Sequence, residues 1–202
     1  MLENGFYNMD CMEAMAQMKD NEFDLAIVDP PYGIGISQNP FRQRQEARNW
    51  DSSIPDMKYF EGLYTISTNQ IIWGGNYFLD YLGKTDGFIV WDKMNGTNPM
   101  ADAELAWQNI KGTTRMFRWH HFSGERITKI HPTQKPIQLY EWLLMNYAKE
   151  GDKILDTHLG SGSIAIACHN LGYDLTACEL DTEYFNKAIE RIEQHKRQQR
   201  LF

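Results

Sequence analysis

Short, continuously apolar runs alternate along the chain with stretches of helical periodicity. The runs have the length and composition of β-strands, and they lie at residues 24–28, 70–73, 88–91, 153–155 and 175–178. Most of them lack the polar alternation of a half-exposed strand, which is typical of central strands covered on both faces. This pattern predicts an α/β fold in which a mostly parallel sheet carries helices on both faces.

Two helices are predicted in the C-terminal third of the chain. In the first, residues 136–147, Pro136 occupies the expected first helical position, apolar residues follow at helical spacing, and Gly151 marks the end. The second begins at Asp181 or Thr182, since either side chain can cap a helix. Its last turns are rich in Lys and Arg, which are favourable at the negative end of the helix dipole.

The composition is that of a soluble globular protein: 202 residues, 42% hydrophobic and 23% charged. We expect one domain over residues 1–202, since this length is enough for a complete core. No apolar run is long enough to span a membrane, and no leader pattern is present, so we expect a cytoplasmic protein without membrane contact. Cys11, Cys168 and Cys178 lack the spacing of a metal or redox motif, which predicts reduced thiols and no metal site.

The charge is unevenly distributed along the chain. The formal net charge is -7, yet residues 108–135 carry six basic side chains and one acidic one. Such a basic island suits a groove for a polyanion, and it suits a solvated hairpin equally well. Residues 116–122 alternate aromatic and polar side chains, which favours a hairpin. The aromatic rings suit base stacking, and they suit the core side of a hairpin equally well. The candidate nucleic-acid contacts are Lys111, Arg115, Arg118 and Trp119, together with Arg42 and Arg44 from 33–53, a predicted mobile loop beside a site.

A glycine turn follows the strand predicted at residues 153–155. Gly160, Gly162 and Ala165 match a relaxed G-x-G-x-x-G/A pattern, and Glu179 ends the next strand 19 residues after Gly160. Such a turn lets a ligand approach the backbone around Ser161, the following helix offers free amides, and the carboxylate can bind ribose hydroxyls. The sequence therefore predicts a site for an adenosine compound.

Asp156 helps to choose between a dinucleotide and another adenosine ligand. A carboxylate at the end of the first strand repels a pyrophosphate but attracts an ammonium group. S-adenosylmethionine carries an α-amino group, a ribose diol and a sulfonium, and it has no phosphate. A nicotinamide-dependent oxidoreductase stays the alternative from the glycine turn alone.

Asp29, Pro30, Pro31 and Tyr32 follow the most apolar predicted strand. Two prolines fix φ and remove two amide donors, so the main chain offers only carbonyl acceptors there. The Asp29 carboxylate and the Pro30 carbonyl can each accept one N–H of a planar amino group, while Tyr32 stacks on the ring that bears it. Two fixed acceptors favour a pyramidal nitrogen whose lone pair can attack, which stabilises the transition state.

With both turns in place, the chain resembles the S-adenosylmethionine-dependent amino-group DNA methyltransferases whose catalytic motif precedes the cofactor motif. The resemblance covers nearly the whole chain. It rests on the tetrapeptide at 29–32, on residues 131–136 (His-Pro-Thr-Gln-Lys-Pro), and on the glycine turn that follows. Further matching segments are 8–11, 72–77, 91–93 and 102–107.

The resemblance implies a Rossmann-like methyltransferase fold with a seven-stranded, mostly parallel sheet. It places the cofactor and the target base side by side at the carboxyl ends of the strands. The implied cofactor is S-adenosylmethionine, the partner is DNA, and residues 131–202 form the cofactor-binding half. The implied cofactor contacts are Asp10, Cys11, Thr133, Lys135, Asp156, Gly160, Ser161, Gly162 and Glu179, with Thr133 and Lys135 at the methionine end. The target base must leave the duplex to reach the tetrapeptide.

Asp rather than Ser at position 29 favours adenine N6 as the target. Cytosine N4, an RNA substrate and a catalytically silent nucleic-acid-binding subunit are the alternatives. Two features depart from the family: Thr157 and His158 stand where Pro-Phe is usual, and only 23 residues separate Trp107 from His131. His158 is expected to pack rather than to catalyse. A recognition insertion as small as 108–130 predicts a short site, low specificity, or contacts borrowed from a homodimer or a second specificity subunit.

Overall fold

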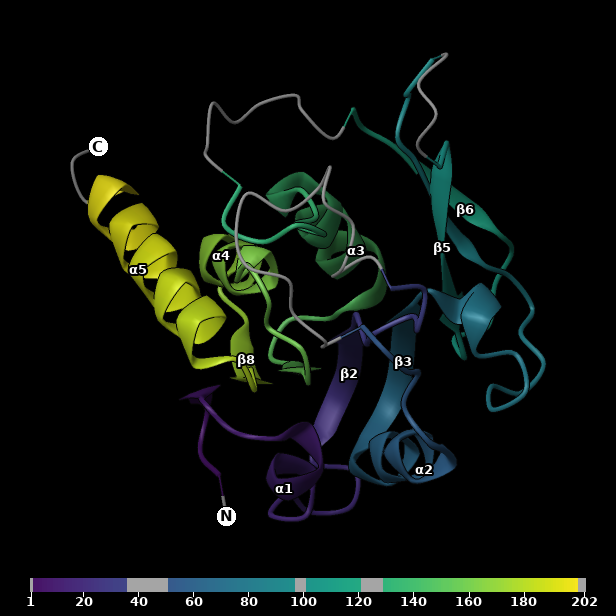
Figure 1. Cartoon of the computed structure of the whole chain (residues 1–202), viewed down its shortest axis with the longest axis horizontal. Coiled ribbons are helices and arrows are strands. Elements are labelled where there is room, and N and C mark those ends of the chain that lie inside the picture. Colours follow the sequence, from purple (N-terminus) through teal and green to yellow (C-terminus); the bar gives the residue numbers. More distant parts are fainter. Residues whose placement is uncertain (1, 36–50, 97–100, 121–128, 200–202) are drawn as a thin grey trace.

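The computed structural model describes residues 2–35, 51–96, 101–120 and 129–199. In this part of the chain, eight strands form one sheet in the order β1-β8-β7-β2-β3-β5-β4-β6 (Figure 1). The strands are β1 (Gly5–Tyr7), β2 (Phe23–Val28), β3 (Ser67–Trp73), β4 (Ile89–Asp92), β5 (Ala103–Gln108), β6 (Arg115–Arg118), β7 (Lys153–Asp156) and β8 (Asp174–Cys178). Strand β5 is antiparallel to both of its neighbours, and every other pair is parallel. The sheet is mixed and mostly parallel, as expected. In the described residues it has eight strands rather than the seven that the resemblance implies, and the strands at its two edges, β1 and β6, are short.

Helices cover both faces of the sheet, as the continuous apolar strands predict. They are α1 (Cys11–Met15), α2 (Met57–Ile66), α3 (Ile137–Tyr147), α4 (Ser163–Leu171) and α5 (Thr182–Gln199), with a short 3-10 helix, η2 (Gly75–Tyr77). In Figure 1, α1 and α2 lie on one side of the sheet and α3, α4 and α5 on the other. Along β2, Leu25 and Ile27 join the core beneath α3 and α4, whereas Ala26 and Val28 join the core beneath α2. Burial on both faces explains why this strand shows no polar alternation.

One local prediction is wrong. Pro136 is the N-cap of α3 rather than its first helical residue, since its backbone is extended (φ -68°, ψ 146°). The hairpin expected for residues 116–122 includes residues 121 and 122, which lie outside the described ranges; within those ranges, β6 pairs in parallel with β4, which is distant in the sequence. Strand β6 is the edge strand of the described sheet, and three of its four residues are exposed. Asp181 caps α5 as expected, and its carboxylate accepts from the amides of Glu183 and Tyr184.

Several expectations concern residues that the structure does not describe. Arg42 and Arg44 fall within residues 36–50, and residues 121–128 belong to the recognition segment 108–130; both stretches lie outside the described ranges. Within those ranges, no helix has both the length and the apolar composition needed to cross a bilayer. The three cysteines are free; Cys168 and Cys178 are buried, and Cys11 is partly exposed.

The topology gathers the chemistry at one edge of the sheet. Strands β1, β8, β7, β2 and β3 are mutually parallel, so the residues that follow them lie along the same edge. Asp29 follows β2, Thr157 follows β7 and Glu179 follows β8. Because β5 is antiparallel, its beginning rather than its end reaches this edge, where Glu104 pairs in register with Trp91 of β4.

Candidate active site

A cavity of about 980 Å³ opens at this edge of the sheet. Its size is at the upper end of the range for small-molecule and cofactor pockets. It brings together residues of both predicted motifs, namely Asp10, Cys11, Asp29, Pro31, Thr133, Lys135, Gly160, Ser161 and Glu179. The four predicted residues that do not line the cavity are Pro30, Tyr32, Asp156 and Gly162. The catalytic and cofactor predictions thus converge on one site.

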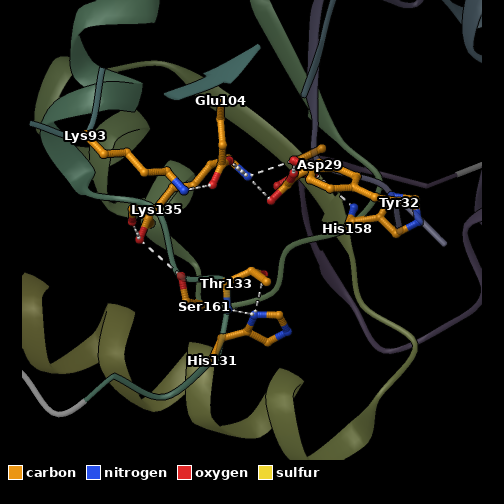
Figure 2. Close-up of polar contacts among 11 residues, drawn as sticks. Asp29, Tyr32, Lys93, Glu104, His131, Thr133, Lys135, His158 and Ser161 are labelled. Atoms are coloured by element: carbon orange, nitrogen blue, oxygen red, sulfur yellow. Dashed lines mark hydrogen bonds and ion pairs between the residues drawn. The ribbon is translucent and has the colours of Figure 1, made fainter. Parts of the chain in front are cut away.

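The carboxylate of Asp29 is fixed through both of its oxygens. The Tyr32 hydroxyl donates to Oδ1 at 2.5 Å, and the Lys135 ammonium donates to Oδ2 (Figure 2). Each carboxylate oxygen has a second lone pair, so these bonds leave acceptor capacity for an incoming N–H. Burial, followed by the charge of Asp29, raises the pKa of Tyr32 well above its ordinary value, which keeps the phenol a donor. The tetrapeptide therefore presents an oriented acceptor.

The ring of Tyr32 needs a glycine beside it. Gly74 follows β3 with φ +70°, and a Cβ at this position would lie 2.3 Å from Tyr32 Cε1. Tyr77 of η2 stacks on the Tyr32 ring, with 5.1 Å between centroids and 18° between planes. Residues 72–77, which resemble a wall of the target pocket, thus support the aromatic ring of the tetrapeptide. Whether Tyr32 also stacks on a target base stays a prediction.

The glycine turn is held by backbone bonds to Glu179. The Gly160 amide donates to Oε2 and the Asp181 amide donates to Oε1, both at 2.9 Å. Burial raises the pKa of Glu179, although these bonds favour the ionised form. Gly162 has φ +72°, and a Cβ there would lie 3.0 Å from Ile192 of α5. Gly162 thus allows the turn and the close packing of α5, whereas Gly160 and Ser161 face the cavity.

Arg191 supports the same turn, and sequence reasoning missed it. Its side chain is buried, and Nη1 donates to the Ser161 carbonyl at 2.8 Å and to Ser163 Oγ at 3.0 Å. The signal was present in the spacing, since Arg191 follows Tyr184 and Ala188 on the apolar face of the helix. A basic residue on a core-facing stripe indicates a buried acceptor, which here is the glycine turn.

Asp156 lies beneath this turn, and its side chain is buried. Its Oδ1 accepts from the His158 amide at 2.9 Å. Burial, with the nearby charges of Asp29 and Glu179, raises the pKa of Asp156 to about 8. The carboxyl is not in the cavity lining, but its neighbours Thr157 and His158 are. The site therefore holds a carboxyl that a cation could draw into its ionised form.

Thr157 and His158, which depart from the usual Pro-Phe, form a hydrogen-bonded chain with Tyr59 of α2. The Thr157 hydroxyl contacts Tyr59 Oη at 2.7 Å and His158 Nδ1 at 2.9 Å. Burial lowers the pKa of His158 to about 4, so the imidazole is neutral at physiological pH. Its ring packs edge-on against Tyr59, with 5.6 Å between centroids. His158 therefore lines the cavity with its ring held by Thr157 and Tyr59.

Thr133 and Lys135 come from one segment but have different neighbours. Thr133 Oγ1 contacts His131 Nδ1 at 3.0 Å, and the His131 ring packs against Tyr184 at the start of α5. Lys135 instead directs its ammonium toward Asp29 (Figure 2). The resemblance places both residues at the methionine end of the cofactor, whereas the ammonium of Lys135 lies at the tetrapeptide.

The predicted nucleic-acid contacts that the structure describes, Lys111, Arg115, Arg118 and Trp119, are not among the residues that line the cavity. Lys111, Arg115 and Arg118 are exposed on β6 and the loop before it, and Arg118 Nε lies 3.4 Å from Asp92 Oδ2. The Trp119 ring stacks on Phe117, with 6.2 Å between centroids, and its carbonyl accepts from Trp91 Nε1. Arg115 and Arg118 thus lie on the edge strand of the sheet, and Lys111 lies in the loop before it.

Comparison with known proteins agrees with this geometry. Residues 90–190 match the N6_N4_Mtase family, described as DNA methylase. The chain is 24% identical to the Type II methyltransferase M.HpaI of Haemophilus parainfluenzae, over 91% of this chain and 72% of that protein. It is 23% identical to the Type II methyltransferase M1.MboII of Moraxella bovis, over 93% of this chain and 96% of that protein.

Solved structures share the fold. The M1.HpyAVI–SAM complex superposes with a TM-score of 0.64 and 20% identity, covering 93% of this chain and 98% of that one. The PvuII DNA methyltransferase, named as cytosine-N4-specific, superposes with a TM-score of 0.62 and 12% identity, covering 95% of this chain and 90% of that one. The family match spans half of the sequence, from β4 into α5, and takes in the segment that carries Lys135 and the glycine turn. The chain therefore belongs to the N6_N4_Mtase family of DNA methylases.

Proposed function

We propose that this chain transfers a methyl group from S-adenosylmethionine to the exocyclic N6 of adenine in DNA. The observation that carries the proposal is the Asp29 carboxylate, oriented by Tyr32 and Lys135 at the wall of a cavity that also contains the glycine turn. A preorganised acceptor beside an adenosine-type site is what transfer to an amino group requires.

The charges of the cavity support a cationic cofactor. Asp10 and Glu179 line it, and Asp156 lies beneath it. Among the described residues that line it, the one lysine is Lys135, which is already paired with Asp29 and Glu104. A pyrophosphate would meet these carboxylates, whereas an ammonium and a sulfonium are attracted to them. When bound, S-adenosylmethionine supplies an activated methyl group, and M1.HpyAVI was solved as its SAM complex.

The chain's own residues hold the acceptor nitrogen. Asp29 accepts one N–H of the amino group, and the carbonyl of Pro30, which is fixed by the double proline, accepts the other. These bonds strengthen as the nitrogen gains positive charge, so they stabilise the transition state more than the ground state. The target base reaches this ledge only after it leaves the duplex stack.

Adenine is proposed over cytosine because residue 29 is Asp. Cytosine N4 is the second candidate, since the PvuII enzyme is named as cytosine-N4-specific and shares the fold. Unmethylated plasmid DNA incubated with the chain and tritiated S-adenosylmethionine, then digested to nucleosides, separates the two. Label in N6-methyl-2′-deoxyadenosine supports the proposal, and label confined to N4-methyl-2′-deoxycytidine refutes the base assignment.

Substitution of Asp29 tests the catalytic role. We expect Asp29→Ala to lower kcat by about two to three orders of magnitude, the effect of losing one preorganised transition-state contact. The S-adenosylmethionine Kd, measured by calorimetry, should change less than about threefold, because Lys135 keeps Glu104 as a partner. Asp20→Asn, which alters an exposed carboxylate, is the control. Parallel losses of affinity and rate would contradict the assignment.

A further inference from the structure

A chain of four charged side chains extends from Asp29 away from the cavity. The Lys135 ammonium contacts Asp29 Oδ2, Glu104 Oε2 at 3.2 Å and the Tyr32 hydroxyl at 3.3 Å. The other carboxylate oxygen of Glu104 binds Lys93 (Figure 2). Only 2% of the Lys135 side chain is exposed. Acids and bases alternate along this chain, so each charge has an opposite neighbour.

The fold brings these residues together from four separate segments. Asp29 follows β2, Lys93 follows β4, Glu104 lies in β5, and Lys135 precedes α3. The antiparallel direction of β5 is decisive, because it turns the beginning of that strand toward the edge where Asp29 lies. Glu104 is therefore held by a strand, which fixes its position more closely than a loop would.

The charges show what Glu104 contributes. A lysine paired with Asp29 alone would neutralise that carboxylate and weaken it as an acceptor. Glu104 shares the ammonium, so the charge of Lys135 is divided between two carboxylates. Burial opposes the charge of Lys135, but Asp29 and Glu104 together raise its pKa. Burial alone would raise the pKa of Glu104, but the charges of Lys135 and Lys93 lower it to about 2.

Other groups around Lys135 do not replace Glu104. The ammonium lies 5.3 Å from the centroid of the Trp73 ring and 5.7 Å from that of Tyr32, where the aromatic faces favour a cation. The pKa of Asp156 at the end of β7 is about 8, so burial keeps this carboxyl mostly protonated at neutral pH. Tyr140 of α3 is a neutral phenol whose pKa burial raises. Within the described residues, Asp29 and Glu104 are the carboxylates in direct contact with Lys135.

We propose that Glu104 is a positioning residue for methyl transfer: it holds Lys135, which fixes the rotation of the Asp29 carboxylate, and Lys93 holds Glu104 in turn. The inference rests on the proposed function, since it assigns Asp29 to the acceptor amine. It differs from the role that the family resemblance gives Lys135, because it places the work of the lysine at the target base rather than at the methionine end of the cofactor.

Glu104→Gln is the primary test, with methyl transfer to plasmid DNA and calorimetric binding of S-adenosylmethionine as readouts. We expect kcat to fall about 10- to 100-fold, the scale of a small misplacement of a catalytic group. The S-adenosylmethionine Kd should stay within about twofold. Removal of Glu104 also lowers the pKa of Lys135, so kcat of the variant should begin to decline at a lower alkaline pH than kcat of the unmodified chain.

A second pair of variants keeps the test independent of folding. Lys93→Met removes the outer partner of Glu104 and should lower kcat. Lys93→Arg keeps the positive charge and should have a kcat close to that of the unmodified chain. Glu193→Gln breaks an exposed pair with Lys196 and serves as the control for loss of one carboxylate. If Glu104→Gln reduces the melting temperature by more than this control does, the comparison of kcat between Lys93→Met and Lys93→Arg decides whether Glu104 has the positioning role.

The outcomes separate this inference from the proposed function. Loss of cofactor affinity at unchanged kcat in Glu104→Gln would return Lys135 to the methionine end and overturn the positioning role. Equal kcat in Lys93→Met and Lys93→Arg, together with an unaltered pH profile in Glu104→Gln, would overturn it as well. An unmodified chain that binds S-adenosylmethionine but labels no DNA would instead refute the proposed function.

Discussion

The Asp156→Asn variant should be more stable than the unmodified chain, by a difference that grows as the pH rises. The reason is that the substitution removes a carboxyl whose ionised form is unfavourable in its buried position. Asp156 is 3% exposed, and its pKa is about 8 because of burial and the charges of Asp29 and Glu179. The asparagine has the same shape, and its carbonyl can accept the bond that the His158 amide donates. The substitution therefore changes ionisation and little else.

The magnitude follows from the difference in pKa between the two states. The reference value for the unfolded chain is 3.8, against about 8 in the fold. The folded state thus retains a proton that the unfolded state releases, and stability is lost as the pH rises from about 4 through 8. Each pH unit in that window lowers the free energy of unfolding by about 1.4 kcal/mol, so about 3 kcal/mol is lost between pH 5 and pH 7.

Urea unfolding followed by tryptophan fluorescence measures this difference. The free energy of unfolding of Asp156→Asn, minus that of the unmodified chain, should increase from pH 5 to pH 8, and other titrating groups cancel in the subtraction. Relaxation of the site would lower the folded-state pKa and narrow this window, so the average slope from pH 5 to pH 8 should be at least about 0.5 kcal/mol per pH unit. A difference that is flat across this range would refute the buried, protonated carboxyl, and Asp20→Asn provides the baseline.

The same carboxyl links cofactor binding to pH. If the ammonium of S-adenosylmethionine lies near Asp156, it must draw the proton from the carboxyl, so affinity should rise as the pH increases from 6 to 8. Calorimetry in buffers of different ionisation enthalpy would detect the released proton. Asp156→Asn should bind more weakly at pH 8 and show no proton release. A pH-independent affinity in the unmodified chain would place the ammonium elsewhere.

Two further substitutions address the target side of the site. Gly74→Ala introduces a Cβ 2.3 Å from the Tyr32 ring at φ +70°, so it should destabilise the fold by at least about 1 kcal/mol and lower kcat by tenfold or more. Unfolding and methyl-transfer assays check this, and normal turnover would show that the ring need not be held. The double variant Arg115→Glu and Arg118→Glu should reduce the slope of log K for DNA against log salt by about 2. An unchanged slope in filter binding would move the DNA contact away from β6.

The sequence could predict the core of the site because its signals are local. Asp29, Thr157 and Glu179 each follow directly after a buried strand, and parallel strands bring such residues to one edge. The prediction needed only that each strand is a buried parallel strand, and it did not need the order of the strands in the sheet. The cavity lining agrees, since it contains residues from the segments after β2, β7 and β8.

The remaining features depend on contacts between distant segments. The parallel pairing of β6 with β4 cannot be read from an aromatic and polar alternation, which a hairpin strand shares. Glu104 lies in a segment that the resemblance includes, but only the antiparallel insertion of β5 between β3 and β4 turns it toward Lys135. Arg191 acts across 28 to 30 residues of sequence. Pairing of this kind is set by tertiary packing rather than by local propensity.

The charge of the site favours a cationic ligand at this edge of the sheet. Among its described residues, acids outnumber bases, with Asp10, Asp29, Glu104, Asp156 and Glu179 against Lys93 and Lys135. Carboxyls without a basic partner in the fold raise the free energy of the folded state, which is a common trade between stability and function. A bound cation relieves that cost, and it stabilises only the folded state. S-adenosylmethionine should therefore raise the melting temperature more than its neutral product, S-adenosylhomocysteine, does, because the sulfonium is the charge that distinguishes the two.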